Sequence, residues 1–144
     1  MLAGNLALMI AALFTGAAFY INIAEQPARL GLDDRGLLAE WKPAYMRGFA
    51  MQLPLVVVGG IFGLIAWWQG RQVGFLVGAV LIIANGPWTV LAIMPTNKIL
   101  MATKLEEAGP NSRSLILKWN RLHAARTSLG GLATIAFLVA LSST

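Results

Sequence analysis

Residues 48–70 read GFAMQLPLVVVGGIFGLIAWWQG, and this stretch decides the fold of the chain. It carries no charged side chain and is flanked by Arg47 and Arg71. A helix needs about 20 mostly apolar residues to cross the hydrocarbon of a bilayer. Because lipid offers the backbone no hydrogen-bond partner, a spanning segment must be a helix or a strand of a closed barrel. The run is too long and too continuous for a barrel strand, so it predicts a membrane-spanning helix.

Three further uncharged runs lie at residues 1–24, 72–97 and 127–144. The first is too long for the apolar core of a signal peptide and lacks a basic start, so we interpret it as a retained helix. The sequence predicts an all-α protein, a four-helix transmembrane bundle that forms a single membrane domain over residues 1–144. The expected spans are about 2–24, 48–69, 73–97 and 124–143, with cytoplasmic loops at 25–47 and 98–123.

The composition agrees with a membrane protein. The 144 residues are 58% hydrophobic and 12% charged, against about 25% charged in soluble domains. So few charges exclude an ordinary soluble enzyme, a disordered chain and a nucleic-acid-binding protein, and the lipid bilayer is the expected partner. No cysteine and a single histidine leave no donor set for a usual zinc or iron–sulfur site. A haem would have to pair His123 with Met94 or Met101, so we predict no metal and no cofactor.

The basic residues predict how the bundle lies in the membrane. Ten of the 11 Lys and Arg residues fall in segments 25–47 and 98–126, and Arg71 alone lies in the short turn 69–72. Cytoplasmic loops carry the excess of basic residues. We therefore expect an up-down-up-down bundle in a bacterial inner membrane, with both termini on the non-cytoplasmic side.

Three sets of residues receive a structural interpretation. The basic residues expected to be solvated or to contact lipid headgroups are Arg29, Arg35, Arg47, Lys98, Lys104 and Arg113. The aromatic residues expected to anchor the bundle at the membrane interfaces are Trp41, Tyr45, Trp67, Trp68 and Trp119. The glycines expected to let helices pack closely are Gly16, Gly59, Gly63, Gly74, Gly78, Gly130 and Gly131.

Two local signals concern helix geometry. Asp33 and Asp34 follow a turn and can cap a helix that starts there. The run Asn85-Gly86-Pro87 lies near the middle of the third span, where the proline removes a backbone donor. Lipid tolerates such a break only where protein or a cavity satisfies the freed groups. We expect an irregular helix here, in which Asn85 and Trp88 either line the floor of a deep pocket or only satisfy the break.

Polar residues gather at one end of the predicted bundle. The polar residues at the cytoplasmic ends of the four spans are Asn22, Glu25, Gln52, Asn97, His123 and Arg126. Trp119, His123 and Arg126 follow the spacing i, i+4, i+7, which places them on one helix face. Buried polar side chains in a membrane face the bundle interior and indicate a functional site.

Structural interpretations of these residues stay open. Glu25 and Arg126 can form an ion pair that joins two helices. Asn22 and Gln52 can be hydrogen-bonding residues between helices, and Asn97 can be a helix cap. In that case the polar end would stabilise the bundle and carry no chemistry.

Three segments resemble a known family. They are GAAFYINIAEQPAR at residues 16–29, PTNKIL at 95–100 and WNRLHAAR at 119–126, and together they are similar to the anthrone oxygenase-like family. The resemblance extends over nearly the whole chain and implies a small four-helix membrane protein. It also implies an activity, since some members oxidise anthrones to anthraquinones with molecular oxygen and without metal or flavin.

The reaction implied by this resemblance gives each candidate residue a role. Removing a proton from the acidified methylene of an anthrone gives a carbanion that can pass an electron to oxygen. His123 is the candidate base, because the pKa of an unperturbed histidine is about 6.5. The candidates for oxyanion stabilisation are Arg126, Asn97 and Asn22, and Glu25 would orient His123 or pair with Arg126. The candidate substrate-binding residues are Trp119, Tyr20 and Trp88, which can stack on the rings, together with Gln52 and Asn85.

A non-enzymatic function is the alternative. The chain would then be an accessory subunit of a larger membrane complex, or it would bind a small lipophile such as a quinone. A homo-oligomer is compatible with either function. A transporter is less favoured, because the four spans show no inverted repeat and no acidic residue in mid-membrane.

Overall fold

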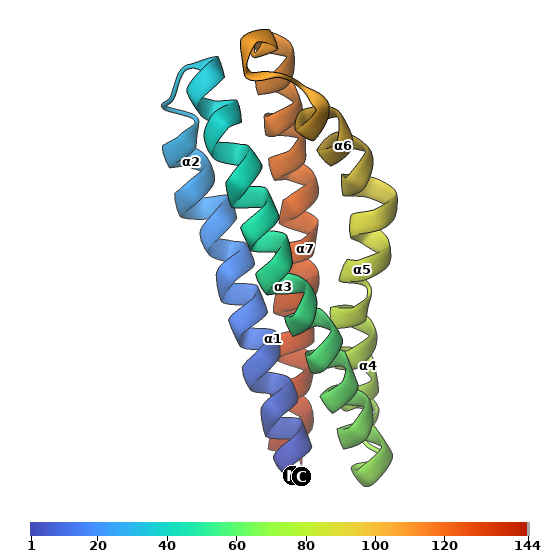
Figure 1. The fold of residues 1–144 in the computed structure, drawn as a ribbon. Helices are drawn as coiled ribbons and strands as arrows, with labels where there is room; N and C mark the ends of the chain where they lie inside the picture. Colours follow the sequence, from blue (N-terminus) through green and yellow to red (C-terminus); the bar gives the residue numbers. More distant parts are fainter. Residues whose placement is uncertain (144) are drawn as a thin grey trace.

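The computed structural model describes residues 1–143 and builds them almost entirely from helix (Figure 1). The elements are α1 (Leu2–Tyr20), the π-helical η1 (Ile21–Glu25), α2 (Gln26–Arg29), α3 (Asp34–Gly70), α4 (Val73–Ile83), α5 (Asn85–Trp88), the π-helical η2 (Thr89–Ile93), α6 (Met94–Ala102), the 3₁₀-helical η3 (Leu105–Glu107) and α7 (Pro110–Ser142). Among the described residues there is no strand, and the longer elements join into four helical rods that are apolar enough to cross a membrane. The predicted all-α, four-helix membrane fold is confirmed.

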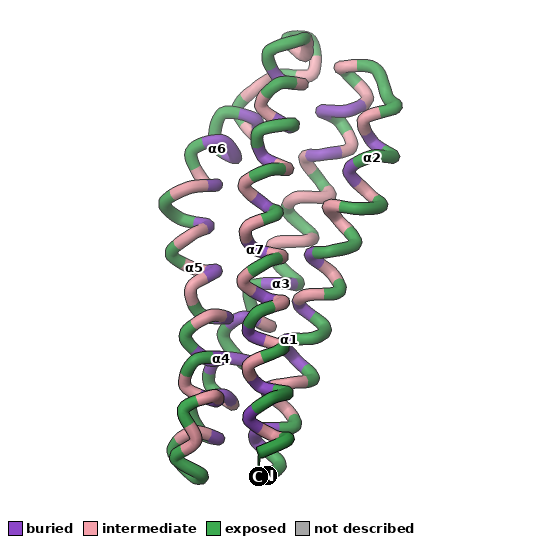
Figure 2. The backbone as a smooth tube through the Cα atoms, turned by 180° about the vertical axis from the view of Figure 1, so that it is seen from behind, coloured by how far each residue is buried: buried purple, intermediate pink, exposed green. Residues whose placement is uncertain are grey.

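The rods pack as neighbours around one axis. The helix α1 packs against α3 and α7, and α4 packs against the same two helices. Both chain ends lie at one end of the bundle, and the turns before α3 and α7 lie at the other (Figure 1). Buried stretches follow the inner side of each rod, while the exposed stretches face outward (Figure 2). The side of the membrane on which each end lies stays a prediction.

The half of the bundle nearest the termini is packed through glycine and aromatic side chains. A Cβ on Gly78 would lie 2.5 Å from the Phe137 ring, and one on Gly130 would lie 2.8 Å from the Phe14 ring. The close packing predicted at these glycines is confirmed. It is wrong for Gly16, which has no neighbouring atom within 4 Å of the Cβ position, and for Gly131, whose nearest neighbour is 3.9 Å away.

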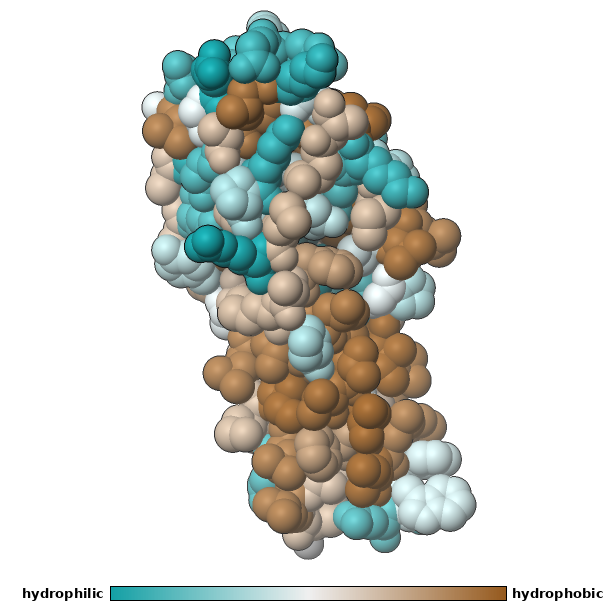
Figure 3. All heavy atoms as spheres, viewed as in Figure 1, coloured by the Kyte–Doolittle hydropathy of each residue, from teal (hydrophilic) through white to brown (hydrophobic). Residues whose placement is uncertain are grey.

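The opposite half extends beyond the predicted spans. α3 has 37 residues and α7 has 33, so at 1.5 Å per residue they are about 50–55 Å long, against about 30 Å for the hydrocarbon core. Stretches 25–47 and 98–123, expected as loops, are therefore mostly helical. Asp33 caps α3, because its Oδ1 accepts the Gly36 N–H at 2.7 Å, which confirms the predicted cap. Hydrophilic residues gather at this end of the molecule (Figure 3).

The extended helices bury aromatic residues that the sequence placed at the membrane interface. Trp41 is fully buried and Trp119 is 4% exposed, so their assignment as interface anchors is wrong. The Trp41 ring stacks on Tyr45 at 5.0 Å between centroids and meets Trp119 edge-on at 5.7 Å. These rings are buried because α3 begins seven residues before Trp41 and packs along α7 there.

Two irregular stretches lie next to this aromatic cluster. η1 ends two residues before Pro27, and η2 ends two residues before Pro95. A proline has no N–H to donate and leaves a carbonyl one turn earlier without its usual partner, and π-helical turns accommodate such a change. α4 also ends at Ile83, just before the run at Asn85. The irregular helix predicted in the third rod is confirmed.

Candidate functional site

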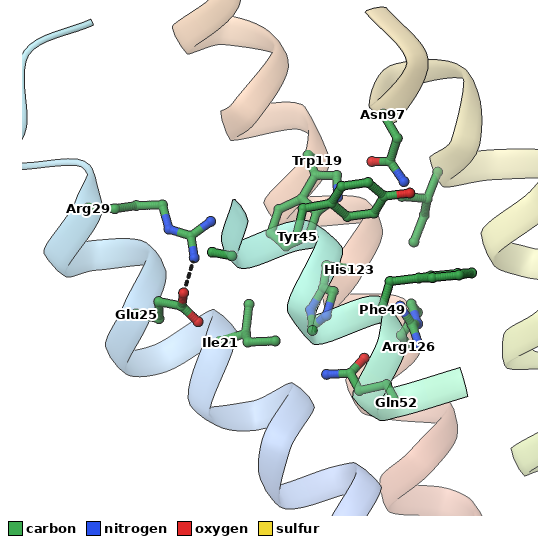
Figure 4. A pocket seen from close by; sticks show the side chains of 13 residues that line it. Ile21, Glu25, Arg29, Tyr45, Phe49, Gln52, Asn97, Trp119, His123 and Arg126 are labelled. Atoms are coloured by element: carbon green, nitrogen blue, oxygen red, sulfur yellow. Dashed lines mark ion pairs between the residues drawn. The ribbon is translucent and has the colours of Figure 1, made fainter. Parts of the chain in front are cut away.

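A cleft opens among the polar side chains where η1, α3, α6 and α7 come together (Figure 4). Its interior has a cavity volume of about 20 Å³, which is room for about one water molecule, and the empty space is about 370 Å³ when the open mouth is counted. The lining residues are Ile21, Glu25, Arg29, Ala44, Tyr45, Gly48, Phe49, Gln52, Ile93, Asn97, Trp119, His123 and Arg126. The four rods thus bring six of the predicted site residues to one cleft: Glu25, Gln52, Asn97, Trp119, His123 and Arg126.

Asn22 holds the imidazole of His123 from behind. The Asn22 Nδ2 donates to the carbonyl oxygen of Asn120 at 3.1 Å and to Asn120 Oδ1 at 2.7 Å. A backbone carbonyl only accepts, so the orientation of the Asn22 amide is fixed. Its Oδ1 therefore faces His123 Nδ1 at 2.9 Å and also accepts the Thr127 hydroxyl at 2.7 Å.

This contact determines the tautomer of the histidine. Because Asn22 Oδ1 can only accept, the Nδ1 atom of His123 must carry the proton and donate it. The Nε2 atom then bears the lone pair, and it has no hydrogen-bond partner within residues 1–143. His123 is 1% exposed, and its ring stacks on Trp119 at 4.9 Å between centroids. The ring is thus held in one position with an unpaired acceptor nitrogen.

Arg126 is a buried cation without an acidic partner. It is 7% exposed and forms no ion pair in the described part of the chain. Its guanidinium lies 5.4 Å from the centroid of the Phe14 ring. The ion pair considered between Glu25 and Arg126 is therefore wrong.

The carboxylate of Glu25 pairs with Arg29 instead (Figure 4). Arg29 also contacts Glu40 Oε2 through Nε at 2.9 Å and is only 4% exposed. The prediction that Arg29 is solvated is wrong, because its guanidinium joins η1 to α3 by two carboxylates. Glu25 consequently orients neither His123 nor Arg126, and Asn22 holds the histidine.

Several buried polar atoms at the cleft have no hydrogen-bond partner. Among them are Nδ2 and Oδ1 of Asn97, Nε2 of Gln52, Nε1 of Trp119 and Nε of Arg126. Buried polar groups are nearly always paired, so each exception calls for an explanation. Four of these five atoms are N–H donors, and with them lies the lone pair of His123 Nε2. The cleft is therefore suited to a ligand with a negatively polarised oxygen and a removable proton.

The structure does not bring all predicted residues to this cleft. Tyr20 is 60% exposed on the outer side of the first rod. The Trp88 Nε1 donates to the carbonyl oxygen of Leu122 at 3.0 Å, so its polar atom is already used between helices. Asn85 lies in a second cavity, and Asn22 lies behind the histidine outside the cleft lining.

Sequence reasoning missed Tyr45, Phe49 and Arg29 as cleft residues. Trp41, Tyr45, Phe49 and Gln52 follow the spacing i, i+4, i+8, i+11, which marks one face of a helix. This signal was available, but Tyr45 and Trp41 were assigned to the membrane interface instead. In the described part of the chain, the His, Asp and Glu side chains form no group that could hold a metal ion.

Four apolar helices with a fixed histidine and unpaired donors at one end define a class: a small helical membrane protein with a polar cleft. Comparison with known proteins makes this specific. The model of the anthrone oxygenase family matches residues 41–136, and the chain belongs to that family.

A curated relative supports the assignment. The chain is 28% identical to a protein described as "Anthrone oxygenase" from Claviceps purpurea (strain 20.1), over 130 residues that cover 80% of this chain and 74% of the relative. No solved structure matches the chain. The residues matched by the family model include Gln52, Asn97, His123 and Arg126.

Proposed function

We propose that this chain is a membrane oxygenase that converts an anthrone-type substrate to the corresponding anthraquinone with molecular oxygen. Family membership supports the reaction class. The observation that carries the proposal is the fixed orientation of the His123 ring. Its Nε2 lone pair lies in a cleft that contains unpaired N–H donors. A general base must stand ready to accept a proton from the bound substrate.

The reaction begins with proton transfer. His123 Nε2 takes one proton from the methylene carbon. The electron pair left behind delocalises through the rings onto the ketone oxygen of the anthrone. The carbanion passes one electron to O₂, and the two radicals combine to form a carbon–oxygen bond. The resulting peroxide is protonated. Loss of the second methylene proton, with cleavage of the O–O bond, then gives the ketone, so that anthrone and O₂ yield anthraquinone and one water.

The donors around the cleft act on the charge that develops in this sequence. As the first proton leaves, the ketone oxygen of the substrate becomes anionic, and the amides of Gln52 and Asn97 and the guanidinium of Arg126 offer unpaired donors in the same cleft. They are held in place before reaction by helices. Removing one such donor typically lowers kcat about 10²–10³-fold.

Substitution of the base tests the function. Wild-type protein and His123→Ala are purified in lipid nanodiscs and supplied with unsubstituted anthrone, and oxygen uptake and anthraquinone formation are followed above the protein-free rate. We expect His123→Ala to fall to that background, and added imidazole to restore part of the rate. Arg121→Ala, at an exposed position on the same helix, is the matched control and should keep the wild-type rate. Unchanged uptake in His123→Ala would refute the base role.

The same preparation separates this proposal from a non-enzymatic one. A quinone-binding or accessory protein would bind the ring compound or a partner complex without consuming oxygen. For the surroundings, the sequence predicts a bacterial inner membrane with the cleft toward the cytoplasm. The curated relative is fungal, so the bacterial membrane stays a prediction.

A further inference from the structure

A second cavity lies directly beside the polar cleft, between α3 and the broken part of the third rod. It has about 450 Å³ of empty space, counting its mouth. Its wall is almost wholly apolar and is built by Leu53, Val56, Val90 and Met94. We refer to this cavity as the apolar chamber. Leu53 and Val90 are 44% and 61% exposed, so the chamber opens toward the apolar surface that faces lipid.

The apolar chamber and the cleft share two walls. Phe49 and Arg126 line both cavities. The unpaired guanidinium of Arg126 thus stands at the junction, between the fixed histidine on one side and the apolar walls on the other. The ketone and the methylene of an anthrone both belong to its central ring, so a substrate would have its central ring at this junction and one outer ring in the apolar chamber.

The far end of the apolar chamber holds an unpaired acceptor. Asn85 is 1% exposed, and its Nδ2 donates to the carbonyl oxygen of Ile82 at 3.1 Å. Since that carbonyl only accepts, the amide orientation is fixed and the Oδ1 atom is the free one. This oxygen is buried and has no partner in the described structure. From Phe49 to Val56 the chamber runs about 10 Å along α3, at 1.5 Å per residue, which leaves room for an outer ring of a fused tricycle and a substituent on it.

We propose that the apolar chamber binds an outer ring of the flat substrate, while the central ring lies at the junction with its oxygen at Arg126, and a hydrogen-bond donor on that outer ring contacts Asn85 Oδ1. The proposal rests on the proposed function for the ligand class, and it adds a specificity residue. The ligand class is a planar aromatic that carries a hydroxyl on its distal ring. A lipid acyl chain would fill the same space but offers no donor, so it would leave Asn85 unpaired.

The first test measures binding and does not depend on turnover. Wild-type protein and Asn85→Leu in nanodiscs are titrated at pH 6 with 2-hydroxyanthraquinone and with 2-methoxyanthraquinone, which lacks the donor. We expect wild-type protein to prefer the hydroxyl compound about tenfold, because the methoxy compound leaves a buried acceptor unpaired. Asn85→Leu should bind both equally. No preference in the wild type, or the same preference in Asn85→Leu, would overturn the assignment of Asn85.

A second variant tests the apolar chamber itself. Gly86 lines it, and no atom lies within 4 Å of the Cβ position, so the Cβ of Gly86→Leu meets no neighbour and its side chain adds bulk at the chamber wall. We expect the affinity for both compounds to fall at least tenfold. Gly16→Leu is the matched control, because Gly16 is an equally open helical position outside the lining of the cleft and the chamber. Unchanged affinity in Gly86→Leu would overturn the proposed binding chamber.

These outcomes are independent of the oxygenase proposal. Tight binding that favours the hydroxyl compound, without oxygen uptake, would contradict the proposed function. It would still support ligand binding in the apolar chamber. Oxygen uptake from anthrone by a Gly86→Leu variant with unchanged affinity would support the proposed function and refute ligand binding in the apolar chamber. The melting temperature of each variant shows whether it is folded. Asn85→Leu removes the unpaired acceptor of the chamber and Gly86→Leu reduces its free space, so one folded variant is enough to decide the proposal.

Discussion

Replacing Arg126 with methionine should stabilise the protein and remove most of its activity. The guanidinium is 7% exposed, forms no ion pair within residues 1–143, and has a buried Nε without a partner. Its guanidinium carbon lies 5.4 Å from the centroid of the Phe14 ring. Methionine fills a similar volume and places no charge inside the bundle.

The magnitude follows from opposing contributions. A charged side chain within a spanning helix costs up to about 3 kcal/mol relative to an apolar one. A cation over an aromatic face recovers about 1 kcal/mol at a partly desolvated position. Arg126→Met should therefore raise the free energy of unfolding by about 1–2 kcal/mol. Loss of the oxyanion donor should at the same time lower kcat by about 10²–10³-fold.

The assay pairs unfolding in mixed micelles with anthrone-dependent oxygen uptake. Arg121→Met, at an exposed position, is the matched control and should change neither quantity by much. A less stable Arg126→Met would show that the guanidinium has a structural partner, and full activity would show that no charge develops beside it. Either result would refute the reasoning for an unpaired functional cation.

Three further predictions concern other parts of the bundle. Asn22→Leu should lower kcat about 10–100-fold with little change in affinity, because His123 loses the acceptor that fixes its tautomer. An unchanged rate in the nanodisc assay would argue against this positioning role of Asn22. Gly130→Leu should destabilise the bundle by about 1–3 kcal/mol through overpacking against an aromatic ring, whereas Gly131→Leu, whose nearest neighbour is 3.9 Å away, should not; equal melting temperatures would contradict the packing argument. Arg29→Met should cost about 2–3 kcal/mol of unfolding free energy, since two partly buried carboxylates lose their cation, and Arg35→Met, at an exposed position, should cost far less.

The apolar pattern was sufficient to predict the four helices, because lipid leaves the backbone few alternatives. The run at Asn85-Gly86-Pro87 likewise predicted the break in the third rod, since a proline cannot continue the hydrogen-bond ladder. Gathering of Gln52, Asn97, His123 and Arg126 at one end also followed from chain direction alone. The helices and the break depend on the local sequence. The gathering of polar residues depends on the reversal of chain direction from one rod to the next.

The contacts between particular side chains could not be predicted from the hydropathy pattern. Glu25 and Arg126 appeared equally able to pair, but η1 places Glu25 one turn from Arg29, and the nearer cation forms the ion pair. Trp41 looked like an interface anchor because the extension of α3 back to Asp34 carries no hydropathy signal. In both cases the missing information was the length and the winding of a helix beyond its apolar part.

The distribution of unpaired groups argues for a ligand and against a purely structural polar end. The half of the bundle nearest the termini is closely packed around Phe14 and Phe137, and the polar side chains of Thr15 and Thr134 in it are hydrogen-bonded to each other at 3.1 Å. At the other end, buried donors of Asn97 and Gln52 lack partners, and each typically costs about 1–3 kcal/mol. Apolar residues of similar shape would avoid that cost, and helices joined by hydrogen bonds would pair these groups with one another. A bound molecule that accepts from the donors and gives a proton to His123 accounts for both features at once.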